Sequence, residues 1–247
     1  MTPQKLTSPP LPGTAPGAEL SLLEDGARYA LLQRLTPVLQ HQIMGNFQSM
    51  DMITVMMDRR LQSASPDLDS MRQDCALLDS VSETAIKSVI NLLTWVRPKP
   101  GSTQRFDAGV EECAQLLLNE FKIKGFVIVN EVSQVPAEFS SRALRSVVSA
   151  ALFCLCDLST APATLTLRAH AYADHIDLSV DLVSTEQEQE QARNVFSNGY
   201  RLLNWRDLEL LAAAESVGLA HSDSGARLTF RLDSENQALP ATLVAPG

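Results

Sequence analysis

The sequence predicts an α+β protein in which an antiparallel helical hairpin is followed by a mixed-sheet α/β sandwich. Between residues 29 and 96, apolar residues recur at spacings of three, four and seven, the pattern of long helices packed on one another. From about residue 104 onward, helical patterns alternate with short runs of alternating apolar and polar residues, which are typical of strands. This order favours a layer of helices on one face of a mixed sheet.

Two helices joined by a short turn form the expected hairpin. The first should run from Tyr29 to about Gln62, with Pro37 kinking or breaking it near its start. The stretch SASPDLD turns the chain, and the second helix should stop at Arg97, before Pro98. Because one hairpin leaves apolar flanks uncovered, we expect a second copy to complete a four-helix bundle, which makes the chain a homodimer.

The second part of the chain has the element order helix, strand, helix, hairpin, helix, strand. The expected helices are residues 107–121, residues 141–157 and NWRDLELLAAAESVG, and the expected strands are GFVIVN, ATLTLRAHA, HIDLSVDLV and ARLTFRL.

Four regions follow from these patterns. Residues 1–20 are predicted to be a disordered tail, residues 21–98 the hairpin, residues 104–233 the α/β domain, and residues 234–247 a flexible tail. The first 18 or so residues hold five prolines, and such a composition buries too little apolar surface to offset the entropy of ordering.

Composition excludes several classes of function. With 29 acidic against 20 basic residues and a formal charge of −9, the chain is a poor candidate for binding nucleic acid. No run of about 18 apolar residues suggests a membrane span, and the N-terminus lacks the apolar core of a secretion signal. We therefore expect a soluble, cytoplasmic protein. The four cysteines are interpreted as reduced core residues: Cys75, Cys113, Cys154 and Cys156.

His41 is the candidate functional residue of the hairpin. At 100° per residue it lies about 190° around the first helix from the centre of the apolar seam, so it should point outward. Gly45, one turn on, leaves that flank free of side chain. An outward imidazole beside a bare patch suits docking by another protein, and we expect Gln42, Met44 and Gln48 to take part with Gly45.

An exposed histidine on such a hairpin, followed by this order of elements, resembles the cytoplasmic core of sensor histidine kinases over residues 28 to 232. LQHQIMGNF resembles the family's phosphoacceptor segment, LLTWVRP the end of its second helix, and the second domain its Bergerat-type ATPase domain. The resemblance implies that His41 is the phosphoacceptor. It also implies that the partner is a response-regulator receiver domain or a sensor kinase.

The departures from the family concern the nucleotide. Ala150 and Cys154 stand where the family has a magnesium-holding pair, and neither suits a cation that prefers oxygen ligands. Asp181 matches an adenine-recognising aspartate, but Val183 replaces the glycine that follows it. Gln42 follows the acceptor where active kinases have an acidic general base. We therefore expect no ATP-dependent kinase activity, no bound cofactor and no metal, with Mg²⁺ supplied by the partner receiver.

Two hypotheses remain open. The first is a dimeric histidine phosphotransfer protein that relays phosphoryl groups to or from a receiver aspartate through His41. The second is a non-enzymatic scaffold or regulator that binds a receiver or a kinase and never carries phosphate. Gln42 favours the second hypothesis, and the outward His41 beside Gly45 favours the first.

Overall fold

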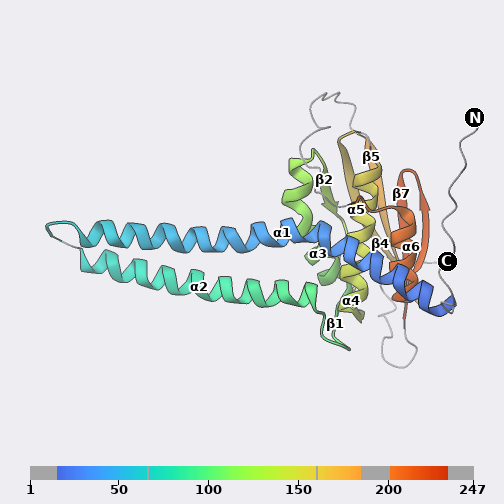
Figure 1. The fold of residues 1–247 in the computed structure, drawn as a ribbon, viewed down its shortest axis with the longest axis horizontal. Helices are drawn as coiled ribbons and strands as arrows, with labels where there is room; N and C mark the ends of the chain where they lie inside the picture. Colours follow the sequence, from blue (N-terminus) through green and yellow to red (C-terminus); the bar gives the residue numbers. More distant parts are fainter. Residues whose placement is uncertain (1–15, 66, 160, 185–200, 233–247) are drawn as a thin grey trace, which may run out of the picture.

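The structure, a computed structural model, describes residues 16–65, 67–159, 161–184 and 201–232. It begins with two long helices, α1 (Pro16–Leu61) and α2 (Leu68–Val96), which form a hairpin that projects from the rest of the molecule (Figure 1). Asp67 caps the start of α2 by accepting hydrogen bonds from the backbone N–H groups of Asp69 and Ser70. The helix ends at Val96, before Arg97 and Pro98, as predicted.

Helix α1 is longer than the sequence pattern predicted. It has 46 residues and continues through Pro37, so a break at that position is excluded. It also begins at Pro16, so the predicted tail of residues 1–20 is too long, although residues 1–15 and the predicted tail 234–247 lie outside the described residues. Proline fits the first position of a helix because its missing N–H would have no partner there.

The second domain contains helical and strand segments that cover residues 103–231. The helical segments are α3 (Phe106–Ile123), α4 (Ser141–Ala143), the π-helical turn η1 (Leu144–Val148), α5 (Ser149–Leu158) and α6 (Trp205–Ala214). The strands are β1 (Thr103–Arg105), β2 (Val127–Asn130), β3 (Glu138–Ser140), β4 (Ala163–Ala171), β5 (His175–Ser184), β6 (Gly218–Ser222) and β7 (Gly225–Arg231).

The main sheet has the strand order β2-β4-β5-β7-β6, and β1 pairs with β3 separately. Strands β2 and β4 are parallel and the other pairs are antiparallel, so the sheet is mixed. Its inward residues, including Leu165, Leu178 and Leu228, are fully buried beneath the helices. The predicted α+β class, with N-terminal helices before a mixed sheet, is confirmed. The pattern missed β1, β3 and β6, which have at most five residues and few buried positions.

The first half of α1 packs on the second domain rather than on the hairpin. Ala27, Ala30, Leu31, Leu35 and Val38 are all buried and belong to the same core cluster as the residues of the sheet. Figure 1 shows α1 crossing the domain before it continues into the hairpin. The predicted division at residues 98–104 therefore does not separate two independent cores, because one helix contributes to both.

None of the described helices combines the length and the apolar character that crossing a bilayer requires.

Candidate functional site

His41 lies on the exposed surface of α1, where the helix leaves the second domain. Gly45 and Gln48 are also exposed, whereas Gln42 is half-buried. A Cβ atom added at Gly45 would meet nothing within 4 Å, so this flank of the helix is open. The placement of these residues agrees with an accessible imidazole beside a bare helical surface.

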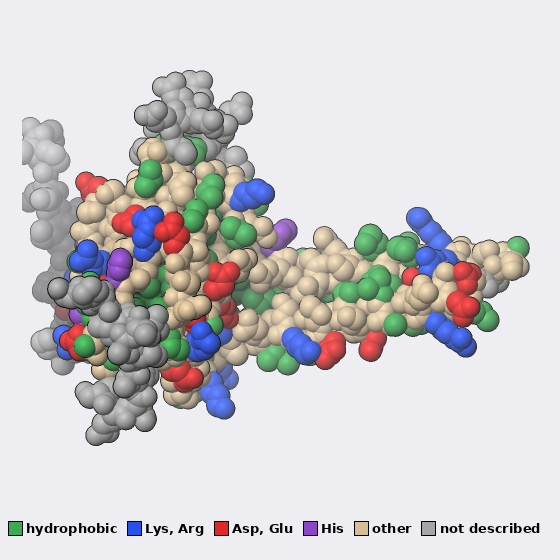
Figure 2. All heavy atoms as spheres, turned by 180° about the vertical axis from the view of Figure 1, so that it is seen from behind, with side chains coloured by type: hydrophobic (Ala, Val, Ile, Leu, Met, Phe, Trp, Pro, Cys, Tyr) green, Lys and Arg blue, Asp and Glu red, His purple; other side chains and the backbone are tan. Residues whose placement is uncertain are grey.

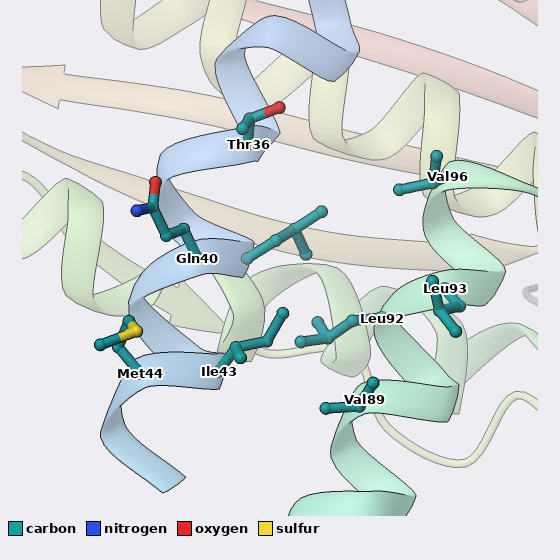
Figure 3. Close-up of a pocket in the computed structure, with 9 residues that line it drawn as sticks. Thr36, Gln40, Ile43, Met44, Val89, Leu92, Leu93 and Val96 are labelled. Carbon is teal, nitrogen blue, oxygen red and sulfur yellow. The ribbon is translucent and has the colours of Figure 1, made fainter. Parts of the chain in front are cut away.

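Met44 lies on a different side of α1 from Gly45 and lines an apolar groove between α1 and α2 (Figure 3). The groove has a volume of about 370 Å³. Its wall on α1 includes Leu39 and Ile43, and its wall on α2 includes Leu92 and Leu93. Met44 thus belongs to the groove, although the sequence grouped it with the docking residues around His41.

Large apolar side chains continue the line of this groove along the hairpin. Six of them are between 48% and 61% exposed: Met44, Phe47, Ile86, Ile90, Leu93 and Val96. Phe47 follows Met44 by three residues, and Ile90 and Ile86 precede Leu93 by three and seven, so each set shares one helical face. Figure 2 shows hydrophobic side chains along the projecting hairpin. An apolar surface of this extent on a projecting element is typical of a protein–protein interface.

The two positions that should hold a nucleotide-bound magnesium are inside the protein. Ala150 and Cys154 are both 0% exposed. The Cys154 thiol donates a hydrogen bond to the backbone oxygen of Asn204 at 3.2 Å, and burial raises the pKa of this thiol. Asn204 is the N-cap of α6. The start of α6 therefore lies against the helix face where the resemblance would place the cation.

The residue that the resemblance matches to the adenine-recognising aspartate already has partners within the protein. Asp181 on β5 forms an ion pair with Arg168 at 3.4 Å and accepts a hydrogen bond from Ser179. Val183, near the end of the same strand, is 60% exposed. Within the described ranges, no three His, Cys, Asp or Glu side chains come together in a way that could hold a metal ion.

A buried ion pair joins α1 to the second domain. Arg34 donates to Asp157, at the end of α5, with an N–O distance of 2.5 Å, and the two side chains are 3% and 5% exposed. The guanidinium also lies over the ring of Phe153, 5.0 Å from its centre. Asp157 accepts a further hydrogen bond from the backbone N–H of Leu203. Burial raises the pKa of Asp157, and the charge of Arg34 partly offsets this rise.

A second ionic contact lies further toward the N-terminus of α1. The Glu215 side chain, just after α6, is 4% exposed and pairs with Arg28 of α1 at 3.0 Å. It also pairs with Arg142 of α4 at 2.9 Å. One buried carboxylate therefore connects the first half of α1 with two helices of the second domain.

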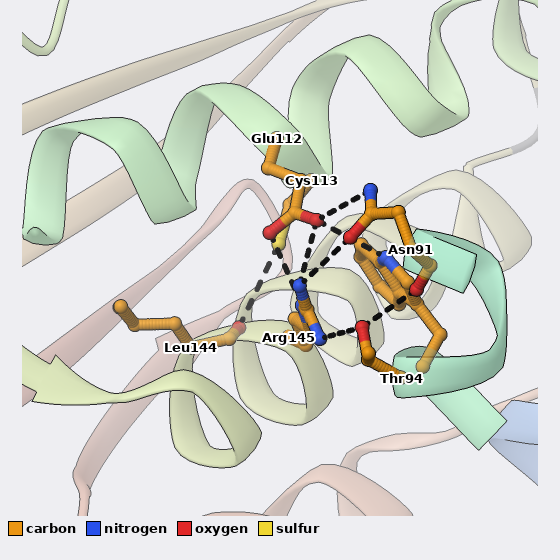
Figure 4. Close-up of polar contacts among 7 residues, drawn as sticks. Asn91, Thr94, Glu112, Cys113, Leu144 and Arg145 are labelled. Carbon is orange, nitrogen blue, oxygen red and sulfur yellow. Dashed lines mark hydrogen bonds and ion pairs between the residues drawn. The ribbon is translucent and has the colours of Figure 1, made fainter. Parts of the chain in front are cut away.

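The end of α2 is attached to the domain by a third polar cluster, centred on Arg145 of η1 (Figure 4). Arg145 pairs with Glu112 of α3 at 2.8 Å and donates to Thr94 Oγ1 of α2 at 2.6 Å. Its guanidinium lies 5.2 Å from the ring centre of Trp95, whose indole N–H donates to Glu112. Asn91 contributes contacts to both Arg145 and Glu112.

The sequence did not reveal these three clusters. One available signal was that residues 27–39 of α1 carry apolar residues all around the helix, which indicates burial on more than one side. A second was an arginine within that apolar segment. The partners of Arg34, however, lie more than 100 residues away, and helical periodicity contains no information about them.

Comparisons with known proteins found similarity only among solved structures. No protein-family model matches the chain, and no curated protein matches it either. The histidine kinase AdeS of Acinetobacter baumannii is 15% identical, with a TM-score of 0.40, over 74% of this chain and 96% of that one.

Two further similar structures are histidine kinases. The catalytic domain of histidine kinase ThkA is 10% identical, with a TM-score of 0.36, over 53% of this chain and 94% of that one. The mycobacterial sensor histidine kinase MprB is 12% identical, with the same TM-score, over 53% of this chain and 95% of that one. All three of these similar structures are histidine kinases.

Proposed function

We propose that this chain is a dimeric two-component signalling protein that carries a phosphoryl group on His41 and exchanges it with the aspartate of a receiver domain. The observation that supports this most directly is the exposed position of His41 on a hairpin helix, with open space at Gly45 one turn away. A receiver must bring its aspartyl phosphate to the imidazole along a line of attack, and an empty helical flank permits that approach.

The transfer reaction requires only one reacting group from this chain, the imidazole of His41. A ring nitrogen of His41 attacks the phosphorus, an N–P bond forms, and the O–P bond to the partner's aspartate breaks and leaves a carboxylate. The receiver supplies the aspartate and Mg²⁺, so no metal-binding residue is needed on this side of the reaction. The reverse reaction uses the same groups and would phosphorylate a receiver.

The proposed homodimer is supported by the exposed apolar surface along the hairpin. A second copy of α1 and α2 would cover the groove at Met44 and Leu93 and the line of Phe47, Ile86 and Ile90. His41 lies on another side of α1, about 100° from the middle of this surface, so it would remain accessible in a four-helix bundle.

The absence of ATP-dependent kinase activity is also a proposal. It is supported by the complete burial of Ala150 and Cys154, neither of which has an oxygen ligand to offer. The carbonyl of Asn204 already accepts a hydrogen bond from the Cys154 thiol. Phosphoryl groups on His41 would then come from a partner.

The second candidate function is a scaffold that binds a receiver or a kinase without carrying phosphate. Gln42 supports it, because a glutamine next to His41 cannot accept a proton at neutral pH. The two functions share the docking surface and differ in whether His41 becomes covalently modified.

One experiment separates them. The protein is incubated with a panel of phosphorylated receivers and autophosphorylated sensor kinases, and acid-labile label on this chain is measured. We expect label on the wild type and none on His41→Ala, whose fold should be preserved because the side chain is exposed. Label that persists in His41→Ala would refute the acceptor assignment. Binding of a receiver without any label would favour the scaffold.

Gly45 can be tested in the same assay with a matched control. Gly45→Leu should weaken transfer, because the side chain fills the flank that the receiver needs. Gly17→Leu is the control, since Gly17 is also exposed on α1 and an added Cβ there meets nothing within 4 Å. Equal transfer by the two variants would argue against docking at Gly45.

A further inference from the structure

The second domain contacts both helices of the hairpin. A domain joined to the hairpin only by the chain after α2 would not require such contacts. We propose that the hairpin and the second domain form one rigid unit. The domain then keeps one position relative to His41 and does not move as a separate module. Three clusters carry this inference, centred on Arg34, Glu215 and Arg145.

Arg34 and His41 are seven residues apart, so they lie two turns and about 10 Å apart along α1 and within about 20° of the same helical face. Arg34 is buried against the end of α5 through Asp157 and Phe153. The face of α1 that the domain covers is therefore the face that becomes exposed at His41.

Arg34 and Asp157 attach α1 to α5. The side chains of Arg34 and Asp157 are only 3% and 5% exposed. If α1 separated from α5, both charged groups would lose the protein contacts that now surround them. Their geometry, with a second acceptor interaction at Asp157 and a ring under the guanidinium, is compatible with one relative position of the two helices. We infer that this buried pair specifies the orientation of the two helices, whatever its net contribution to stability.

The hairpin is attached to the second domain at three points. Arg34 and Arg28 hold α1 at two points about 9 Å apart along its axis. Arg145 holds the end of α2 through Thr94 and Asn91, and its partner Glu112 accepts a hydrogen bond from Trp95 of the same helix. Contacts at three separated points on two helices restrict rotation as well as translation. The segment between Val96 and Thr103 therefore does not act as a hinge.

This rigidity does not depend on phosphotransfer, and it can be tested without a partner. Spin labels are placed on cysteines introduced by Ser80→Cys on α2 and Asp223→Cys in the turn between β6 and β7, both of which are exposed. The predicted core position of Cys75 is wrong, because this residue is exposed. It is therefore changed to serine.

The three remaining cysteines should stay unlabelled. Cys113, Cys154 and Cys156 are buried, and burial raises the pKa of Cys113 and of Cys156 to about 12. Their thiols are therefore protonated at the pH of labelling and unreactive. Distances between the labels are measured on the full chain by double electron–electron resonance, with an excess of unlabelled protein to suppress signals between copies.

We expect a single narrow distance distribution in the wild-type background. A broad distribution, or two distances, would overturn the proposal without bearing on transfer through His41. The anchor variant combines Arg34→Met, Asp157→Leu and Arg145→Leu, and should give a broader distribution. Lys87→Met is the control, because it removes only an exposed ion pair with Glu83 on α2.

A narrow distribution in the anchor variant would show that the clusters of Arg34 and Arg145 do not fix the domain. Circular dichroism and thermal melting check that the variant is folded. If the triple substitution does not fold, the pair Arg34→Met and Asp157→Leu is measured alone, since it leaves no unpaired charge. The wild-type distribution decides the question of rigidity in either case.

Discussion

Replacing Arg34 by methionine should destabilise the protein strongly. Methionine retains much of the apolar stem of arginine but removes the charge that faces Asp157. The Asp157 carboxylate would then be buried with only the Leu203 N–H as a polar partner in place of two. Breaking a buried ion pair by removing one member costs about 3–5 kcal/mol in the free energy of unfolding, and we expect a loss in this range.

The loss should depend on pH in a defined direction. Burial already raises the pKa of Asp157 in the wild type, so its ionisation reduces stability as the pH rises through the folded-state pKa. Without Arg34 the folded-state pKa rises further, and the penalty extends over a wider range. The difference between variant and wild type should be largest at neutral pH and should shrink as the pH falls toward the ordinary aspartate value of 3.8.

Urea denaturation at several pH values, followed by circular dichroism, measures both effects. The control is Arg34→Met combined with Asp157→Leu, which removes the unpaired charge and should recover most of the lost stability. A loss of less than about 1 kcal/mol at neutral pH, as is usual for exposed pairs, would refute the reasoning. A loss that is independent of pH would refute the role given to Asp157.

Four further predictions concern other parts of the molecule. Gly45→Ala should raise the free energy of unfolding by about 1 kcal/mol in urea denaturation, because alanine favours the helix and its Cβ meets nothing. Gly109→Ala should lower it, because its Cβ would lie 2.7 Å from Leu144 Cδ1. Ile90→Glu should convert the proposed dimer to monomers in a mass measurement at micromolar concentration, and a monomeric wild type would contradict the bundle. Titration calorimetry should show no binding of Mg-ATP tighter than about 100 μM, or roughly 5.5 kcal/mol.

The sequence by itself determined the elements with a strong period. The seams of α1 and α2, the helices α3 and α6 and the β4–β5 hairpin follow from apolar spacing, because one face of each element must be buried. The outward direction of His41 followed from the same spacing. Short strands with few buried positions, such as β1 and β6, have no comparable signal, and they form because a neighbouring strand offers hydrogen bonds.

Only the tertiary structure decided how the two parts of the chain are joined. A linker at residues 97–102 suggests two domains in sequence, yet the first half of α1 completes the core of the second domain. The partners of Arg34 and Arg145 lie 123 and 33 residues away, at Asp157 and Glu112. Pairing over such distances depends on which helices pack together, and periodicity within a single helix specifies a buried face but not the surface that covers it.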